Sequence, residues 1–451
     1  TSSLLRATLF YILKNINKYF NLNYSNMKLL FICAFIILSL NPFMIYDLGF
    51  IYSFSVCFGI FFYHDFIKGN YFIKLFKLSL ITFLFSLPIT ATINYEINLS
   101  SIFINMIFIL WISLVVYPIS LIAFIIPILN PIFSILINIT TFLNSIMNNL
   151  SIIINIPKTS IVIPILFYMV LLLRKKNLYY ALIILILIPK FIKILDNNYY
   201  VYFFDVGQGD SAVLVSPYHQ EVLMIDTGGK TTFTKEPWQK SSKNYNVSDG
   251  VVKFLKSVGI TKINYLIITH GDEDHAKDAQ NIIKKFKVKN IILNNGSINS
   301  LEKNLLNQNI NITNRYHLKY FNVINLNNEL YNNENDNSIV NYISFLSYKF
   351  LFMGDASKTV EDNILKKYNL KNVDVIKVGH HGSKTSTDKG FIKKIKPTYS
   401  IISVGRSNRY NHPHEEVLNI LKNTNILRTD KDGTITFRLD KKGFDFNLCK
   451  P

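Results

Sequence analysis

A run of seven residues, Thr-His-Gly-Asp-Glu-Asp-His, concentrates side chains that can bind metal ions. It places His270, Asp272, Asp274 and His275 within six residues. The run follows the apolar segment 263–268, which is typical of a buried strand. A turn there can direct alternate side chains to two adjacent points, whereas a helix would spread them around its axis. The pattern predicts a two-metal site, with His270 and Asp272 at one ion and Asp274 and His275 at the other.

Two later polar clusters predict the rest of the metal shell. A strand predicted at 348–353 ends before Asp355, and a strand predicted at 373–378 ends before the run Gly-His-His-Gly-Ser that contains His380 and His381. Polar residues that follow strands meet at one edge of an αβ scaffold. Asp355 is the natural bridging carboxylate, and His380 or His381 adds an imidazole. A single His after a strand is more often a surface residue, so the prediction depends on the three clusters together.

The donor set indicates both the metal and the reaction. It is rich in oxygen, and the carboxylate at Asp272 favours Mn²⁺ or Mg²⁺ over Zn²⁺. Two ions ~3.5–4 Å apart activate a hydroxide and stabilise the leaving oxygen of a displacement. The predicted reaction is therefore hydrolysis, most plausibly of a phosphodiester.

The elements around these clusters divide the chain into an apolar part, 1–195, and a soluble part, 196–451. Of the 48 Lys and Arg residues 13 lie in the first part, and so do only 3 of the 29 Asp and Glu residues. The net charge of +19 is shared about equally, and the basic soluble part suits a polyanion. A lysine-rich composition explains that charge equally well. Three cysteines do not form a disulfide framework.

The first part has the pattern of a multi-pass membrane region. Residues 97–157 contain no charged side chain and are long enough for two or three spanning helices. Further candidate spans are 29–46, 49–63, 75–92, 160–173 and 179–195. Prolines and asparagines interrupt the apolar runs, which indicates broken or re-entrant helices. The basic loop 174–176 favours a cytoplasmic position, so one more crossing places the soluble part outside the cytoplasm.

The second part alternates strands and helices. Apolar runs predict strands within 199–214 and 221–225, in addition to those that precede the metal clusters. Helical spacing predicts helices at 249–258 and 274–286, and another that ends at Tyr368.

These motifs resemble a known family. The metal run resembles the metallo-β-lactamase signature, with Asp272 in place of the usual second His. Further segments resemble motifs of the ComEC family of DNA-uptake channel proteins, in chain order: Asp205-Val-Gly-Gln-Gly-Asp210, Asp226-Thr-Gly-Gly, Asn335-Asp-Asn-Ser338, Met353-Gly-Asp355, His380-His-Gly-Ser-Lys-Thr-Ser386, Arg406-Ser-Asn-Arg-Tyr-Asn-His-Pro413 and Thr429-Asp-Lys-Asp-Gly-Thr434. Ser3-Leu-Leu-Arg6 and Asn41-Pro42 resemble motifs of that family's membrane region.

The resemblance implies a fold and a function. It implies an N-terminal polytopic α-helical membrane region and a C-terminal metallo-β-lactamase-like αββα sandwich. The family passes one DNA strand across the cytoplasmic membrane during natural transformation, and its hydrolase domain is a nuclease that degrades the other strand. The implied cofactors are two divalent ions, with Mn²⁺ favoured and Zn²⁺ as the alternative. The implied partners are single- and double-stranded DNA, the membrane, other competence proteins and further copies of the chain. The family's usual N-terminal soluble domain is missing, so a fragment or a short variant is expected.

The resemblance also assigns roles to residues. The implied metal ligands are His270, Asp272, Asp274, His275 and Asp355, with one residue of the pair His380 and His381 as a ligand and the other facing the scissile phosphate. The implied catalytic group is Asp274, His380, His381 and His412. Ser383 and Ser386 would bind phosphate oxygens, and Asp226 would orient the ligands from behind. Asp210 would either do the same or serve only as a turn residue.

Two other readings compete with a channel that carries a nuclease. One is a membrane-tethered metallohydrolase that acts on another phosphoester, with the membrane region as an anchor only. The other is a non-enzymatic channel that merely binds DNA, which the intact ligand set argues against. The interrupted apolar helices argue against a simple anchor, because a pore needs broken or polar-lined helices.

Overall fold

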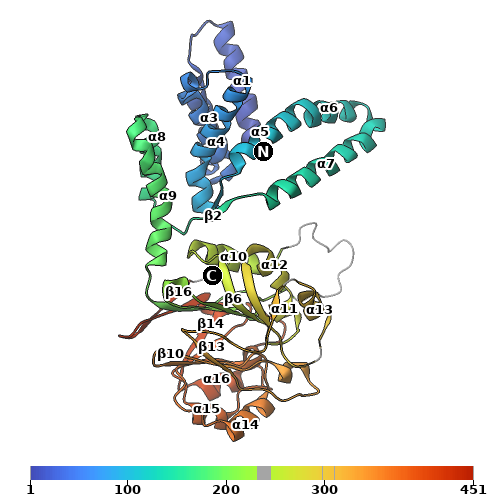
Figure 1. Ribbon diagram of the computed structural model, residues 1–451, viewed down its shortest axis with the longest axis vertical. Helices are drawn as coiled ribbons and strands as arrows, with labels where there is room; N and C mark the ends of the chain where they lie inside the picture. The colour runs from blue at the N-terminus through green and yellow to red at the C-terminus, as the bar shows by residue number, and fades with distance from the viewer. Residues whose placement is uncertain (1, 231–244, 297, 309, 450–451) are drawn as a thin grey trace. The chain divides into compact units, whose positions relative to one another are not determined.

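The computed structural model describes residues 2–230, 245–296, 298–308 and 310–449. The chain divides into two compact units, Thr1–Lys190 and Phe191–Pro451 (Figure 1). The first unit is helical and the second is built on two β-sheets.

The helical unit follows the apolar pattern closely. Side chains cap several helices, since Ser25, Asp47 and Asn70 each accept a backbone N–H of the following first turn. The helices are α1 (Ser2–Tyr19), α2 (Asn26–Leu40), α3 (Leu48–Phe62), α4 (Tyr71–Asn94), α5 (Ser101–Trp111), α6 (Tyr117–Ile125), α7 (Asn130–Asn149), α8 (Val162–Leu173) and α9 (Tyr179–Ile194). Of these, only α1 was not expected, because Lys14 and Lys18 interrupt its apolar residues.

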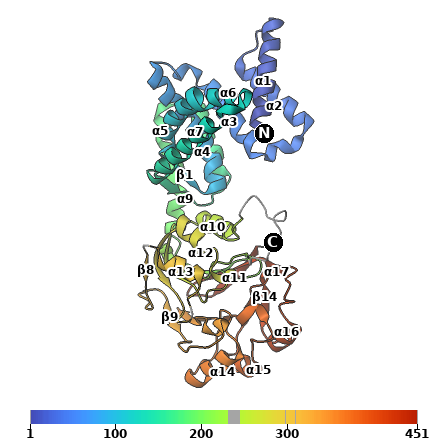
Figure 2. The same cartoon turned by 90° about the vertical axis from the view of Figure 1, so that its right-hand side faces the viewer.

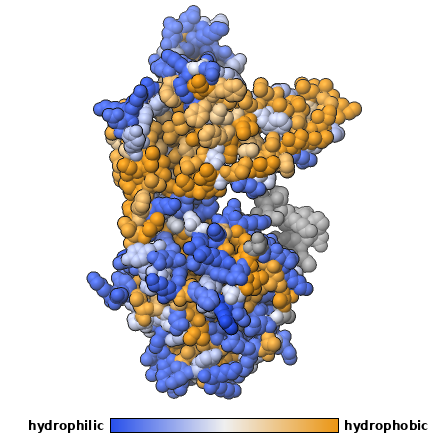
Figure 3. All heavy atoms as spheres, in the orientation of Figure 1, coloured by the Kyte–Doolittle hydropathy of each residue, from blue (hydrophilic) through white to orange (hydrophobic). Residues whose placement is uncertain are grey.

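Four helices in the described part of the chain are long and apolar enough to cross a membrane. They span Tyr71–Asn94, Ser101–Ile125, Pro127–Asn149 and Lys176–Ile194. The other three expected spans form helices of only 12 to 15 residues, namely α2, α3 and α8. Large apolar side chains on this unit are strongly exposed, for example Phe124 at 87% and Ile128 at 82%. They form a broad apolar area in Figure 3. Such a surface needs an apolar solvent, so this unit is a membrane region.

The core of the helical unit lies around a proline-containing stretch of α4. Phe85 is buried against residues of α8, including Phe167 and Leu171. Pro88 interrupts the hydrogen-bond ladder of α4. The hydroxyls of Ser55 and Tyr168 donate to the carbonyl of Phe85 at 2.9 and 2.8 Å. Neighbouring helices therefore satisfy the backbone near the break, as a membrane setting requires.

A two-stranded ribbon closes the base of an arm made of α5, α6 and α7. Strand β1 (Glu96–Asn98) pairs antiparallel with β2 (Ile153–Asn155). Within the arm only Ala123 is buried among the helical residues. Figure 1 shows α6 and α7 as an open hairpin that extends away from α3 and α4, with the two helices meeting at its tip.

The second unit contains two mixed sheets. The first has the order β16-β15-β3-β4-β5-β6-β7-β8 and the second β14-β13-β12-β11-β10-β9. The strands are β3 (Tyr199–Phe203), β4 (Ala212–Val215), β5 (Val222–Ile225), β6 (Lys262–Ile267), β7 (Lys287–Ile292), β8 (Asn311–Ile312), β9 (Asn322–Asn325), β10 (Asn341–Phe345), β11 (Tyr348–Phe352), β12 (Val375–Lys377), β13 (Tyr399–Ile402), β14 (Asn425–Arg428), β15 (Thr434–Leu439) and β16 (Phe444–Cys449).

Helices cover the outer faces of both sheets. On the first sheet lie α10 (Ser248–Ser257) and α12 (Ala279–Lys285), and on the second lie α14 (Lys358–Lys367), α15 (Lys389–Ile395) and α16 (Glu415–Leu421) (Figure 2). The core between the sheets is aromatic, with Phe203, Phe352 and Phe437 fully buried. The architecture is the αββα sandwich that the sequence resemblance implied.

One predicted helix is broken in two. The expected helix 274–286 forms α11 (Glu273–Ala276) and then α12. Asp278, which lies between them, accepts the backbone N–H of Ser248 at 2.8 Å. A continuous helix would pair the carbonyls of Asp274 and His275 with the N–H groups four residues on, but they accept the N–H groups of Asp210 and Thr227 at 3.1 and 2.8 Å instead.

Candidate metal centre

Three polar clusters meet at one edge of the two sheets, where β6, β11 and β12 end. His275 and His381 are buried there, with at most 2% exposure. Nδ1 of His275 lies 2.8 Å from Oδ2 of Asp226, and Nδ1 of His381 lies 2.9 Å from the carbonyl of Ser403. Because an ionised carboxylate and a carbonyl only accept, both Nδ1 atoms carry the proton. In the neutral form of each ring the lone pair is therefore on Nε2, which faces the centre.

His270 is oriented in a related way. Its Nδ1 lies 3.2 Å from the hydroxyl of Thr269 and 3.3 Å from that of Ser338. The Thr269 hydroxyl donates to Asp226 Oδ2 at 2.7 Å, so its lone pairs are free to accept from His270. Asp226 also accepts the backbone N–H of Thr269 at 2.8 Å. One carboxylate thus sets the proton positions of both imidazoles in the metal run.

The inward-facing atoms of the centre match the needs of a bound cation. Among the described residues, Nε2 of His270, His275 and His381 and Oδ1 of Asp355 are buried without a hydrogen-bond partner. Buried polar atoms without partners are costly, and several in one place indicate a bound ion. Ligand atoms of His270, His275 and Asp355 lie within 4.8 Å of one another, and so do those of Asp274, His275 and His381. The residues present therefore fit divalent metal ions.

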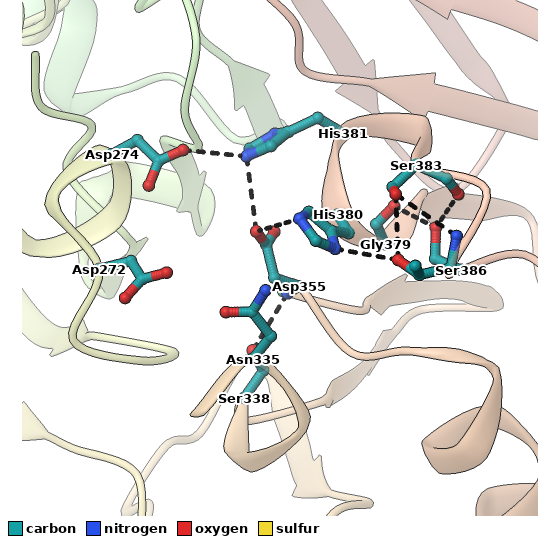
Figure 4. A network of polar contacts seen from close by, with 12 residues as sticks. Asp272, Asp274, Asn335, Ser338, Asp355, Gly379, His380, His381, Ser383 and Ser386 are labelled. Carbon is teal, nitrogen blue, oxygen red and sulfur yellow. Dashed lines mark hydrogen bonds and ion pairs between the residues drawn. The ribbon is translucent and has the colours of Figure 1, made fainter. Parts of the chain in front are cut away.

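Asp355, which follows β11, lies between the imidazoles, and its role as a bridging ligand stays a prediction. Its Oδ1 is 3.2 Å from His275 Nε2, and its Oδ2 is 3.6 Å from His381 Nε2 (Figure 4). Asp274 Oδ2 lies 3.3 Å from the same His381 atom. Burial opposes ionisation, but His381 and His275 hold the pKa of Asp355 well below its usual range. The pKa of Asp274 is also lowered against burial, by the neighbouring imidazole of His381.

The ligands overlap rather than form the two separate pairs expected from the sequence. Asp272 lies near His270, with 3.6 Å between Oδ2 and Nε2, and its side chain is half exposed. His275, in contrast, groups with His270 as well as with Asp274. Because α11 begins at Glu273, Asp274 and His275 lie on a helical turn and project toward a shared point.

The two adjacent histidines differ in burial. His381 is enclosed, and although burial alone would lower its pKa, Asp355 and Asp210 raise it to about 10. The His380 side chain is 27% exposed, and its Nε2 lies 3.9 Å from Asp355 Oδ2. Burial lowers the pKa of His380. His381 therefore faces the ligands, while His380 lies toward solvent, with its Nδ1 3.2 Å from the hydroxyl of Thr385.

The two predicted phosphate-binding serines are part of the internal bracing of their loop. The Ser386 side chain is fully buried and donates to the carbonyl of Gly379 at 2.7 Å. Ser383 accepts from the Thr385 hydroxyl at 3.0 Å. Figure 4 shows both serines on the far side of His380 from Asp274. Ser386 is thus committed to the backbone and does not offer its hydroxyl to a substrate.

Asp210 has a partner that sequence reasoning missed. Lys377, at the end of β12, is 3% exposed and donates to Asp210 Oδ2 and, at 3.3 Å, to the carbonyl of Gly354. Asp210 Oδ1 lies 3.4 Å from His381 Nδ1. Burial opposes ionisation, but Lys377 and the imidazoles lower the pKa of Asp210. A lysine inside an apolar strand run was the available signal.

Close backbone approach fixes the turn that carries Asp210. Gly209 has a φ of +135°, and a Cβ there would lie 2.3 Å from the carbonyl oxygen of Asp274. The N–H of Asp210 donates to that same oxygen at 3.1 Å. Only glycine fits this position.

A second missed residue, Glu361 on α14, holds the loop that follows the two histidines. It is 1% exposed, and its carboxylate accepts the backbone N–H groups of Thr387 and Asp388 at 2.8 and 2.6 Å. Burial raises the pKa of Glu361 to about 7. No sequence signal marks it, because glutamate is common on helices.

His412 reaches the edge of the centre, as the resemblance implied. Its ring meets that of His380 edge to face, with 5.8 Å between centroids. Burial and the nearby His381 lower the pKa of His412 to about 4, so its imidazole is uncharged at neutral pH.

Comparison with known proteins assigns each unit. Residues 1–188 match the model of the Competence protein family, and residues 204–301 match that of the Metallo-beta-lactamase superfamily. The chain thus has a region similar to the Competence protein family, followed by a region similar to the Metallo-beta-lactamase superfamily. The second region has the fold of a metal-dependent hydrolase, and its His and Asp clusters are candidate ligands for divalent ions.

Three curated proteins are similar to this chain in sequence. ComE operon protein 3 of Bacillus subtilis is 32% identical, over 55% of this chain and 34% of its own length. Recombination protein 2 of Haemophilus influenzae is 29% identical, over 48% and 25%. Competence protein ComA of Neisseria gonorrhoeae is 27% identical, over 55% and 33%. The match thus covers between 25% and 34% of the length of these relatives.

A solved structure is similar as well. It is the metallo-beta-lactamase fold protein YhfI from Bacillus subtilis, with 9% sequence identity and a TM-score of 0.32. The similarity covers 51% of this chain and 96% of that one.

Proposed function

We propose that this chain is the channel and nuclease part of a DNA-uptake protein of natural transformation. The membrane region passes single-stranded DNA across the cytoplasmic membrane, and the metallo-β-lactamase domain hydrolyses the other strand. The nuclease proposal rests on one observation. Three buried imidazoles direct unpartnered Nε2 atoms toward Asp355 and Asp274. The competence-protein match of residues 1–188 supports the role in DNA uptake.

The centre holds two divalent ions in this proposal. The ligands are His270, Asp272, Asp274, His275, Asp355 and His381. Three carboxylates among six donors favour Mn²⁺, with Zn²⁺ as the alternative. Two such ions supply Lewis acidity to a phosphodiester and lower the pKa of the attacking water.

The remaining side chains position the ligands and the substrate. Asp226 keeps the imidazole protons on Nδ1, as hydrogen-bond partners of metal ligands commonly do. Lys377 neutralises Asp210 behind His381. His380, on the solvent side of Asp355, is placed to contact the scissile phosphate.

The domain acts outside the cytoplasm in this proposal. The basic loop of Arg174, Lys175 and Lys176 precedes α9 and favours the cytoplasmic side, and α9 then crosses to the hydrolase unit. Other competence proteins deliver the DNA, and further copies of the chain complete the channel. Reporter fusions at the C-terminal end should be active outside the cytoplasm, and activity only inside would contradict this orientation.

Metal-dependent cleavage of DNA tests the proposed nuclease activity. The whole chain, purified in detergent with Mn²⁺, should cut end-labelled DNA, and Asp274→Ala should abolish cutting. Asp362→Ala, which removes an exposed carboxylate of α14, is the matched control and should cut like the parent. Absence of cleavage by the parent with Mn²⁺, Mg²⁺ or Zn²⁺ would overturn the nuclease proposal.

A transformation assay separates a channel from a tethered hydrolase. A variant that lacks the arm of α5 to α7 but still cuts DNA in vitro should fail to take up DNA. Normal uptake by that variant would show that the arm is dispensable and would favour a hydrolase with a membrane anchor.

A further inference from the structure

The loop 405–414, between β13 and α16, has a composition unlike that of the metal centre. It carries Arg406, Arg409, Tyr410, His412 and His414 and contains no carboxylate. Both arginines are exposed. A basic and aromatic segment beside a phosphodiester centre has the residue types that contact a nucleic-acid strand, with cations for phosphates and rings for bases.

The loop is held in one shape by its own hydrogen bonds. The side-chain amide of Asn408 donates to the carbonyls of Gly405 and His412 at 3.1 and 2.7 Å, and its oxygen accepts the N–H of His412 at 2.9 Å. Three bonds from one side chain tie the two ends of the turn together. The rings on this loop are therefore presented by a braced backbone.

The loop is also joined to the turn that carries the two site histidines. The N–H of His414 donates to the carbonyl of Gly382 at 3.0 Å. Gly382 has a φ of +81°, and a Cβ there would lie 2.6 Å from Cβ of Pro413. This close approach fixes the distance between loop 405–414 and the metal centre.

A row of rings runs from the metal centre to the surface. His380 lies next to Asp355, and the ring of His412 meets His380 at a centroid distance of 5.8 Å. Tyr410 stacks on His412, with centroids 5.6 Å apart and an angle of 26° between the planes. The outermost ring, Tyr410, is 49% exposed although it belongs to this stack.

We propose that Tyr410, supported by His412, is a platform on which a base close to the scissile phosphate stacks. The proposal rests on the nuclease function proposed above and adds to it how the strand is held. Stacking on an aromatic side chain is tolerant of sequence because every base has a π face. The arginines at 406 and 409 flank the platform along the chain and attract the phosphates on either side of that base. A nuclease that degrades a whole strand needs this kind of sequence-independent grip.

Substrates with and without bases test the platform. The whole chain in detergent with Mn²⁺ is given a single-stranded oligodeoxynucleotide, and an oligonucleotide of the same length in which every residue is abasic. Tyr410→Ala should raise KM for the natural oligonucleotide by about 5- to 150-fold, the range that 1–3 kcal/mol of stacking per base gives, and change kcat less. Tyr410→Phe should retain the parent's KM. The abasic substrate should show a high KM with the parent and a much smaller effect of Tyr410→Ala.

Tyr218→Ala is the matched control, because that tyrosine is 45% exposed and follows the end of β4 remote from Asp210. An unchanged KM in Tyr410→Ala would overturn the platform, and so would an equal loss on natural and abasic substrates. If the parent cuts no DNA at all, the nuclease proposal fails, and anisotropy of the labelled oligonucleotides then decides on the platform alone. Weaker binding of only the base-containing strand by Tyr410→Ala supports it, and equal binding refutes it.

Discussion

The Asp226→Asn substitution tests how the fold presents the lone pair of His275. Asp226 Oδ1 accepts the N–H of Thr269, while Oδ2 accepts from Nδ1 of His275 at 2.8 Å. An asparagine that keeps its oxygen toward Thr269 turns its NH₂ group toward that Nδ1. This arrangement favours the tautomer of His275 that carries its proton on Nε2. A protonated Nε2 has no free lone pair and cannot bind a metal ion.

The size of the effect follows from the lost hydrogen bond. A hydrogen bond to a charged group contributes about 1.5–3 kcal/mol. To bind a metal ion, His275 in the variant must first move its proton from Nε2 back to Nδ1, which costs this free energy. Since every 1.4 kcal/mol changes an equilibrium constant tenfold, metal binding should weaken by about 10- to 150-fold. This range agrees with the loss of about 10- to 100-fold in metal affinity that is typical when a group that orients a metal ligand is mutated. We expect Mn²⁺ affinity of Asp226→Asn to fall by that factor.

Calorimetric titration of the whole chain in detergent with Mn²⁺ measures the change. Asp362→Asn makes the same chemical substitution at an exposed position of α14 and should bind Mn²⁺ like the parent. A melting curve of the metal-free protein shows whether the fold survives. Parent-like affinity in a folded Asp226→Asn variant would refute the tautomer argument, and so would an equal decrease in Asp362→Asn.

Three further predictions concern buried charges. Lys377→Met leaves the carboxylate of Asp210 buried without its cation and should destabilise the hydrolase unit by about 3–5 kcal/mol; adding Asp210→Asn should recover part of this in denaturant unfolding, and no recovery would contradict the pairing. Glu361 has a pKa of about 7 in the fold against 4.5 in the unfolded chain. Its contribution to stability is therefore fully present below pH 4.5 and is lost as the pH rises to 7, by about 3 kcal/mol, so Glu361→Gln should flatten that part of the melting temperature profile. Burial lowers the pKa of His381, but Asp355 and Asp210 raise it to about 10, so Mn²⁺ must displace a proton; affinity should rise about tenfold per pH unit between roughly pH 6 and pH 8, and a pH-independent affinity would count against His381 as a ligand.

The location of the site was predictable because its signals are local. Each metal cluster follows an apolar strand run, and parallel neighbours such as β11 and β12 bring strand ends to one edge. Asp355 and His381 could therefore be placed near each other from the strand pattern, whereas His270 follows β6 of the other sheet and reaches them only because the two sheets pack together. The sharing of His275 between two ligand groups was not predictable, because it depends on the first turn of α11.

Other features depend on contacts between distant residues. The burial of Lys377 makes sense only beside its partner Asp210. That residue lies 167 positions earlier in the chain and reaches Lys377 because the two sheets pack together. Ser386 occurs in a motif with the residue types of a phosphate site, but its hydroxyl is directed inward by the carbonyl of Gly379. Likewise, the break between α11 and α12 arises because the carbonyls of Asp274 and His275 accept the N–H groups of Asp210 and Thr227, and not because of helix-breaking residues.

The ribbon of β1 and β2 makes the arm an insertion in the topological sense. Asn98 pairs with Ile153, and the N–H of Leu99 donates to the carbonyl of Ile152 at 2.9 Å, so residues 99–152 leave and re-enter the helical unit at one place. The core around Phe85 and Phe167 is formed by segments outside that insertion. A nick or an inserted tag near Leu150 should therefore be tolerated without loss of the remaining helices, which makes the arm a natural attachment point for a probe that reports on its movement.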